Sequence, residues 1–135
     1  MQRAKHVTGT VEVLLSTFNG EKYLAEQLDS IWGQDYRDVA LAIRDDGSTD
    51  GTVTLLERLI AGHAVSRLAV GEHLGAAQSF MALLANVSRD ARYAAFCDQD
   101  DVWMKDKLAV AVCALEEMDE AVRRAAVKRY LRSTR

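Results

Sequence analysis

The 135-residue sequence contains no proline and only two cysteines, Cys97 and Cys113. Two cysteines are too few for a disulfide framework, and neither belongs to a CxxC pair that would indicate zinc or redox chemistry. We therefore expect both side chains to be small buried hydrophobes. No apolar run approaches the roughly 20 residues that a transmembrane helix requires, and residues 1–10 lack the apolar segment of a signal peptide. The expected location is the cytoplasm.

Several catalytic signatures are also missing. No serine or cysteine stands in a pattern with a base and an orienting residue, and the sequence has neither a GxGxxG motif nor a Walker lysine loop. Hydride transfer and ATP hydrolysis are therefore not expected.

The charge is unevenly distributed along the chain. All 20 acidic residues lie at or before Glu120, whereas six of the 17 basic residues lie between Arg123 and Arg135. The acidic body lacks the basic surface that nucleic-acid binding requires, so we expect no nucleic-acid partner. The basic end is either simply solvated or docks on an anionic membrane surface, where each basic group contributes on the order of 1 kcal/mol.

The hydrophobic pattern predicts a single α/β domain. Apolar residues make up 49% and charged residues 27% of the chain, a balance typical of globular proteins. Apolar runs typical of buried strands cover residues 11–16, 39–44, 65–70 and 93–97, and each is followed by a polar loop and a stretch with helical spacing. This alternation predicts a Rossmann-like, mostly parallel sheet with flanking helices.

Each helical stretch is defined by one apolar face. The faces comprise Leu24, Leu28 and Ile31; Val53, Leu56, Leu59 and Ile60; Ala77, Phe80, Leu84 and Val87; and Leu108, Val112, Leu115, Met118 and Val122. No glycine or proline interrupts the sequence beyond Lys105, which therefore permits a helix that extends as far as Leu131.

Every unusual polar cluster follows one of the predicted strands. The clusters are residues 16–20, 45–46, 71–75 and 98–101. In open parallel sheets, ligands bind at the carboxyl ends of the strands, where loops and helix N-termini converge. We therefore expect a binding site at that edge of the sheet.

The run Asp98-Gln99-Asp100-Asp101 is the most informative of these clusters. Three neighbouring carboxylates repel one another unless a cation neutralises them. Mg²⁺ or Mn²⁺ prefers carboxylate oxygens, with substrate phosphates and water completing the shell. Asp98 and Asp100 can reach one ion only across a turn, and Asp101 either joins the site or caps the helix that starts near Lys105.

The pair Asp45-Asp46 allows two interpretations. Its Asp-Gly and Ser-Thr-Asp-Gly context is ordinary turn and helix-capping chemistry. A carboxylate at a strand end also accepts hydrogen bonds from a ribose hydroxyl or a base N–H. Composition does not choose between the two. His73, in the next loop, is expected to be exposed or packed rather than catalytic.

Three segments together resemble a known family. They are residues 14–24 (LLSTFNGEKYL), residues 43–52 (IRDDGSTDGT), and residues 98–103 (DQDDVW) with Lys107-Leu108. In letters, order and spacing they resemble the N-terminal, donor-binding half of glycosyltransferase family 2 enzymes with the GT-A fold. The resemblance covers about residues 11–115 and is greatest to the rhamnosyltransferase-type members that build bacterial surface polysaccharides.

The resemblance implies transfer of a sugar from a nucleoside-diphosphate sugar, with inversion at the anomeric carbon. Ser16, Thr17 and Phe18 match the family's loop beside the nucleotide base. Asp46, together with Asp45, matches its carboxylate contacting base or ribose.

The same resemblance assigns the divalent metal, Mg or Mn, to a DxD motif. Asp98 and Asp100 match that motif, which holds the ion on the donor diphosphate. Two positions depart from the family pattern: His73 stands where relatives usually carry asparagine, and Phe18 replaces the commoner tyrosine.

The resemblance also divides the chain. It implies an N-terminal extension over residues 1–10, a nucleotide-sugar-binding GT-A half-domain over 11–117, and a basic helical tail over 118–135. Family members continue with residues that bind a saccharide or lipid-linked acceptor and carry the general base, so a truncated GT-A fold with little transfer activity is expected. The location is then the cytoplasm or the inner face of the membrane. The alternative is a non-catalytic nucleotide-binding or interaction module whose tail docks on a membrane or partner subunit.

Overall fold

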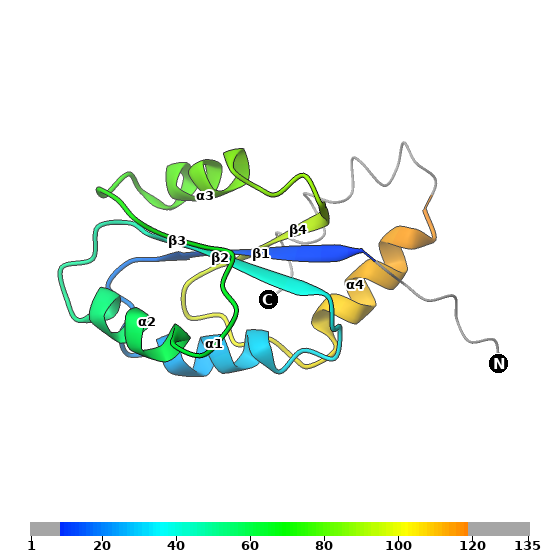
Figure 1. The fold of residues 1–135 in the computed structure, drawn as a ribbon, viewed down its shortest axis with the longest axis horizontal. Coiled ribbons are helices and arrows are strands. Elements are labelled where there is room, and N and C mark those ends of the chain that lie inside the picture. The colour runs from blue at the N-terminus through cyan, green and yellow to red at the C-terminus, as the bar shows by residue number, and fades with distance from the viewer. Residues whose placement is uncertain (1–8, 119–135) are drawn as a thin grey trace.

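The computed structural model describes residues 9–118, and within them four strands alternate with four helices (Figure 1). In chain order the elements are β1 (Thr10–Thr17), α1 (Leu24–Trp32), β2 (Val39–Asp45), α2 (Thr52–Ile60), β3 (Arg67–Val70), α3 (Ala76–Ala85), β4 (Ala91–Cys97) and α4 (Lys107–Glu116). The predicted alternation of strands and helices is confirmed. Most of the predicted extension and tail lies outside the described residues, so both stay predictions.

The four strands form one parallel sheet in the order β3-β2-β1-β4. In the register of the central pair, Thr17 of β1 lies opposite Asp45 of β2. On the other side of β1, Leu15 lies opposite Cys97 of β4. The predicted parallel sheet is therefore confirmed, and the ends of β1, β2 and β4 meet at one edge.

Helices cover both faces of the sheet. Figure 1 shows α3 on one face and α1 and α2 on the other, with α4 beside them. Because side chains alternate along a strand, Val11, Val13 and Leu15 of β1 point to the α1 face, whereas Leu14 points to the α3 face. Covering both faces suits a parallel sheet, whose strands are mostly apolar on both sides.

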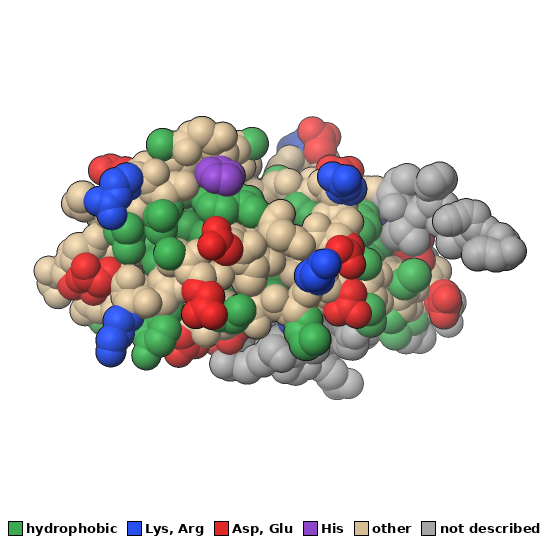
Figure 2. All heavy atoms as spheres, turned by 90° about the horizontal axis from the view of Figure 1, so that it is seen from below, with side chains coloured by type: hydrophobic (Ala, Val, Ile, Leu, Met, Phe, Trp, Pro, Cys, Tyr) green, Lys and Arg blue, Asp and Glu red, His purple; other side chains and the backbone are tan. Residues whose placement is uncertain are grey.

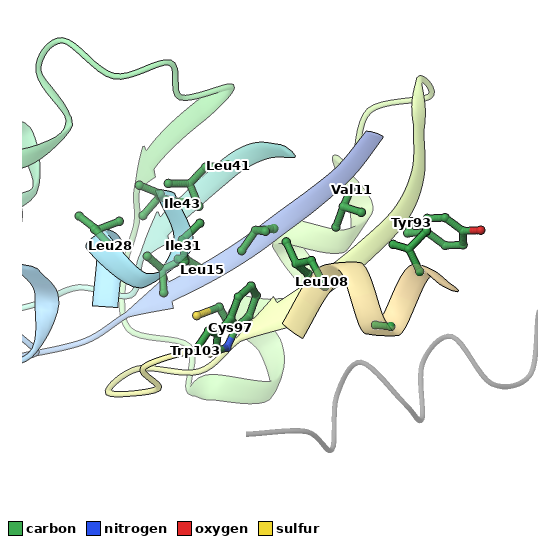
Figure 3. Close-up of a cluster of buried hydrophobic side chains, with 14 of the residues drawn as sticks. Val11, Leu15, Leu28, Ile31, Leu41, Ile43, Tyr93, Cys97, Trp103 and Leu108 are labelled. Atoms are coloured by element: carbon green, nitrogen blue, oxygen red, sulfur yellow. The ribbon is translucent and has the colours of Figure 1, made fainter. Parts of the chain in front are cut away.

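The larger hydrophobic cluster lies between the sheet and the helices α1, α2 and α4 (Figure 3). Leu28 and Ile31 of α1, Ile43 of β2, and Trp103 and Leu108 from the segment after β4 all belong to it. The predicted faces of α1 and α4 are therefore the faces that pack, since Leu24, Val112 and Leu115 are also buried. This cluster anchors the segment after β4 to α1.

The predicted face of α3 is partly wrong. Its fully buried residues are Ser79 and Leu83, whereas Phe80 and Leu84 are partly buried and Ala77 is exposed. The helix is rotated from the expected orientation because Ser79 faces the sheet, where its hydroxyl takes part in a buried hydrogen-bond network.

Helix α4 is shorter than the helix that the sequence permits. Helix α4 stops at Glu116, and its final turn is tightened by hydrogen bonds from Glu117 N–H to the Ala114 carbonyl and from Met118 N–H to the Leu115 carbonyl. Absence of glycine and proline permits a longer helix but does not enforce one. The basic residues 123–135 lie outside the described residues.

The two cysteines differ in environment. Cys97 is buried as expected, and burial raises the pKa of its thiol. Cys113 is exposed on α4, so the expectation of a second buried cysteine is wrong. The difference follows from helical periodicity, because Val112 occupies the buried face of α4 and its neighbour in sequence points about 100° away.

Charged side chains are interspersed on the face of α1 and α2. Figure 2 shows acidic and basic groups of the described residues lying among hydrophobic ones, and the basic groups do not gather into a stripe on this face. Among the described residues, no helix has both the length and the apolar character needed to span a bilayer.

Candidate functional site

The carboxyl ends of β1 and β4 form the centre of the candidate site. From β1 the chain proceeds to β2 and β3 on one side, and β4 then pairs with the other side of β1. Such a reversal of strand order opens a crevice at the carboxyl ends of the two strands, where open α/β sheets bind ligands. The polar segments 16–20 and 98–101 follow from these two strands and are brought together there.

A cavity of about 210 Å³ lies at this crevice. All four predicted strand-end clusters contribute to its lining, which comprises Ser16, Thr17, Phe18, Asp46, His73, Ala76, Phe80, Asp98 and Gln99. The structure therefore brings five of the seven predicted site residues together. The other two, Asp45 and Asp100, are not among the lining residues.

The Asp46 carboxylate is bound by a buried guanidinium and by two backbone N–H groups. Arg44 Nη1 donates to its Oδ1 at 2.6 Å, and the backbone N–H groups of Leu74 and Gly75 donate to Oδ1 and Oδ2 at 2.8 and 3.0 Å. His73 Nδ1 lies 3.0 Å from Oδ2. Burial opposes ionisation of this carboxyl, but the Leu74 N–H, the Arg44 guanidinium and the other donors hold the pKa of Asp46 below its ordinary value. Asp46 thereby fastens the loop after β3 to the end of β2.

Arg44 and Ser79, two buried residues that the sequence analysis did not identify, support Asp46. Arg44 Nη1 also donates to Ser79 Oγ at 2.9 Å, and Ser16 Oγ donates to the same oxygen at 2.7 Å. A buried guanidinium requires such partners because an unpaired charge is costly to bury. The available signals were an arginine inside an apolar strand and a serine in the middle of an apolar helix.

Asp45 is fully buried and has intramolecular partners. Its carboxylate accepts hydrogen bonds from Thr17 Oγ1 at 2.7 Å, from Ser48 N–H at 2.8 Å and from Ser48 Oγ at 2.7 Å. These bonds close the turn after β2 and tie it to the end of β1. Turn chemistry therefore describes Asp45, whereas the carboxylate that borders the cavity is that of Asp46.

Gly47 sits at the point where this turn meets the loop after β3. Its φ is +80°, and a Cβ at this position would lie 2.8 Å from the backbone nitrogen of His73. Only glycine fits without strain, both because of the positive φ and because two backbones approach closely. The close approach places His73 beside Phe18, with ring centroids 4.4 Å apart, so the two rings form one wall of the cavity.

The acidic run forms the turn that a shared ion would require. Asp101 N–H donates to the Asp98 carbonyl at 3.1 Å, and Asp100 has a φ of +66° at the third position of the turn. Asp98 borders the cavity and Asp100 is exposed. Asp101 does not cap α4, because its Oδ2 accepts from Asp98 N–H at 3.3 Å and the residue preceding the helix is Asp106.

The acidic turn fits a cation that is only partly liganded by protein. Within residues 9–118, no three His, Cys, Asp or Glu side chains gather into a group that could hold a metal ion. Mg²⁺ and Mn²⁺ commonly bind through one or two carboxylates with phosphate oxygens and water. The donor set of this turn suits that mode rather than a closed protein cage.

A larger, mostly apolar hollow of about 430 Å³ adjoins the cavity. It shares Ala76, Phe80 and Asp98 with the smaller cavity and extends along α3 and β4 to Met81 and Asp101. Phe80 and Phe96 line it and meet edge to face, with centroids 5.2 Å apart. The site thus has a polar compartment between loops and an apolar one beside β4.

Comparison with known proteins identifies the family. The model for glycosyl transferase family 2 matches residues 12–132. The chain belongs to this family. It is similar to the dTDP-rhamnosyl transferase RfbG of Shigella flexneri, with 36% identity over 105 residues that cover 75% of this chain and 36% of the relative. It is also similar to the putative teichuronic acid biosynthesis glycosyltransferase TuaG of Bacillus subtilis, with 32% identity over 99 residues, 73% of this chain and 38% of the relative.

Solved structures of the GT-A fold resemble this chain as well. The mannosyltransferase PcManGT from Pyrobaculum calidifontis, in complex with GDP-Man and Mn²⁺, matches with a TM-score of 0.68 and 30% identity over 76% of this chain and 31% of that one. S. aureus TarS 1–349 in complex with UDP-GlcNAc matches with a TM-score of 0.69 and 26% identity over 80% and 31%. The predicted fold and family are confirmed, and the chain spans about a third of the length of these relatives.

Proposed function

We propose that this chain binds a nucleoside-diphosphate sugar together with a divalent cation, and provides the donor side of an inverting glycosyl transfer. The observation that carries the proposal is the convergence of four strand-end loops on one cavity, with Phe18, Asp46 and Asp98 in its lining. A nucleotide base can stack on the aromatic ring, and a ribose can bond to the carboxylate. A metal-bound diphosphate fits the acidic turn.

The nucleoside is assigned to the wall formed by residues 16–18, Asp46 and His73. The Phe18 ring faces a base, since every base presents a π-face for stacking. Asp46 faces a ribose hydroxyl or a base N–H, although its oxygens already accept hydrogen bonds from Arg44, Leu74 and Gly75. Asp46 therefore acts on the nucleotide sugar mainly by fixing the loop that carries His73.

The diphosphate is assigned to the acidic turn. Asp98 and Asp100 would hold Mg²⁺ or Mn²⁺, which when bound neutralises the charge that develops on the leaving diphosphate. In support, the solved relative PcManGT contains Mn²⁺ together with its nucleotide sugar. The acceptor and the general base are assigned to no residue of this chain.

The biological setting follows from the relatives alone. RfbG is described as a rhamnosyl transferase and TuaG as a putative teichuronic acid biosynthesis glycosyltransferase, so we assign this chain to surface-polysaccharide synthesis. In this proposal the acceptor is a saccharide or lipid-linked molecule, and the chain acts in the cytoplasm or at the inner face of the membrane.

The proposal is tested by titrating the chain with UDP and TDP, with and without Mn²⁺, in wild type and Asp100→Asn. We expect Mn²⁺ to strengthen binding of at least one nucleotide about ten-fold or more, and Asp100→Asn to remove most of that gain, since loss of a ligand typically weakens metal sites by at least this factor. Gln78→Met, an exposed substitution on α3, is the control. Metal-independent binding that ignores Asp100→Asn overturns the proposal.

A further inference from the structure

Helix α1 carries a polar strip on a face that otherwise packs into the core. Gln27 and Ser30 lie at i and i+3 on the helix, and Gln34 follows two residues after the helix ends at Trp32. Gln27 is 1% exposed and Gln34 is 8% exposed, and Leu28 and Ile31 of the same helix are also buried. Burying amide side chains is unfavourable unless each polar atom has a partner.

The partners of the strip lie on one segment, the stretch from the acidic turn to the start of α4. Gln27 Nε2 donates to the carbonyl of Asp98, the first carboxylate residue of the turn. Ser30 Oγ accepts from Trp103 N–H at 3.0 Å. Both contacts join residues more than 70 positions apart in the sequence.

Gln34 donates one hydrogen bond to this segment and accepts another from it. Its Nε2 donates to the Met104 carbonyl at 2.7 Å, and its Oε1 accepts from Leu108 N–H at 3.0 Å. The neighbouring Asp35 N–H donates to the Lys105 carbonyl at 2.9 Å. An amide that both donates and accepts fixes the position of a loop more strictly than an apolar contact, because both bonds are directional.

The contacts replace the regular hydrogen bonds that this segment lacks. Between the end of β4 at Cys97 and the start of α4 at Lys107, the chain forms neither strand nor helix, so its backbone groups need other partners. The α1 strip supplies them at the beginning, middle and end of the segment. Gln27 acts on the peptide of Asp98 itself, and therefore on the orientation of that carboxylate.

We propose that Gln27, Ser30 and Gln34 are positioning residues that hold the acidic turn in its cation-binding geometry before the cation and donor arrive. This inference rests on the proposed function, because it assigns the strip a role in holding the cation of the same site. None of the three residues lines the cavity, so they act through the backbone of the turn and not by contact with the donor.

The test uses methionine substitutions, which keep side-chain length and remove the hydrogen bonds. Mn²⁺ affinity in the presence of saturating UDP or TDP is measured by electron paramagnetic resonance for wild type, Gln27→Met, Gln34→Met and the control Gln78→Met. We expect about ten-fold weaker Mn²⁺ binding in the two strip variants, the size typical when a residue that orients a metal ligand is removed. Nucleotide binding in metal-free buffer should stay within about two-fold of wild type, because the wall assigned to the nucleoside (residues 16–18, Asp46 and His73) is untouched.

Amide hydrogen exchange provides the structural readout. Trp103 and Leu108 N–H should be protected in wild type, and Leu108 N–H should exchange faster in Gln34→Met. In Gln34→Glu the carboxylate still accepts from Leu108, so protection there should return although the bond to Met104 is lost.

The outcomes separate the inference from the proposed function. Unchanged Mn²⁺ affinity in both strip variants overturns the inference alone. The inference is also overturned if nucleotide affinity falls equally with and without metal, because that result would indicate general loosening of the fold. A wild-type chain that binds neither nucleotide nor Mn²⁺ overturns the proposed function, and the inference with it.

Discussion

The side-chain oxygen of Gln99 accepts a hydrogen bond from the backbone N–H of Phe18 at 2.7 Å. Gln99 is the second residue of the acidic run, and Phe18 lies in the loop between β1 and α1. The bond therefore joins the two segments that follow β1 and β4, where the strand order reverses. The same amide oxygen lies 2.8 Å from where a Cβ on Gly20 would sit, so a larger residue there would displace the end of the Gln99 side chain.

Removing this bond should weaken nucleotide binding. In Gln99→Met the Phe18 N–H loses its partner, a loss of about 1 kcal/mol that corresponds to roughly five-fold weaker UDP or TDP binding if the loop must be reordered on binding. Isothermal titration in metal-free buffer measures the change. Gln99→Glu keeps an acceptor oxygen and should retain protection of the Phe18 amide from hydrogen exchange; wild-type affinity in Gln99→Met would contradict the prediction.

Asp46 should make the free energy of unfolding depend on pH in the acidic range. Its pKa is lower in the folded protein than in the unfolded chain, so its ionised form contributes stability that is complete above the unfolded pKa of about 4 and is lost as the pH falls through the folded pKa. Asp46→Asn removes this contribution and leaves the Arg44 guanidinium without its buried carboxylate partner, which should cost about 3 kcal/mol at pH 7.

The check on Asp46 is urea unfolding between pH 7 and pH 3. The difference in unfolding free energy between wild type and Asp46→Asn should shrink as the pH falls below about 4, since protonation abolishes the ion pair in the wild type too. A difference that stays constant over this range would show that Asp46 contributes through shape rather than charge.

The local periodicity of the sequence accounts for most of the fold. Val11, Val13 and Leu15 alternate with residues of the opposite face, and Leu24, Leu28 and Ile31 recur at helical spacing, so their burial follows from pattern alone. The convergence of residues 16–20 and 98–101 also followed from the sequence, because parallel strands bring their carboxyl ends to one edge.

What could not be predicted depends on contacts between distant residues. Gln27 looks like an ordinary polar position of an amphipathic helix and Gln34 like a loop residue after it, and their burial depends on a segment some 70 residues away. Ser79 faces the sheet only because Arg44 and Ser16 supply partners there. Local patterns describe which side chains are apolar, but a polar residue is buried only when its partner, however distant, is placed to meet it.

Gly47 should tolerate alanine poorly, and Gly62 provides a matched comparison. Both have positive φ, +80° and +85°, but a Cβ on Gly47 would meet the backbone of His73 whereas nothing lies within 4 Å of one on Gly62. Gly62→Ala should cost about 1 kcal/mol from backbone strain alone. Gly47→Ala should cost about 1–3 kcal/mol more because two backbones must separate. Urea unfolding of both variants measures the difference, and equal losses would contradict the close approach.

Phe18 should contribute to nucleotide binding by stacking its ring on the base. The ring lines the cavity beside His73, and any nucleotide base can stack on an aromatic side chain. Phe18→Leu keeps an apolar side chain but removes the π-face, which should weaken UDP and TDP by about five-fold each, or about 1 kcal/mol, at the lower end of the stacking range.

Phe18→Tyr is the matched control, because it keeps the ring and adds only the hydroxyl. Its affinity should stay within about two-fold of wild type for both nucleotides, since the stacking surface is unchanged. Fluorescence or calorimetric titration distinguishes the variants. If Phe18→Leu binds as tightly as wild type, the ring does not stack on the base; if it weakens UDP but not TDP, the contact reads base identity and stacking is not its basis. Equal weakening of both nucleotides, with full retention in Phe18→Tyr, is the result that places the base against this wall.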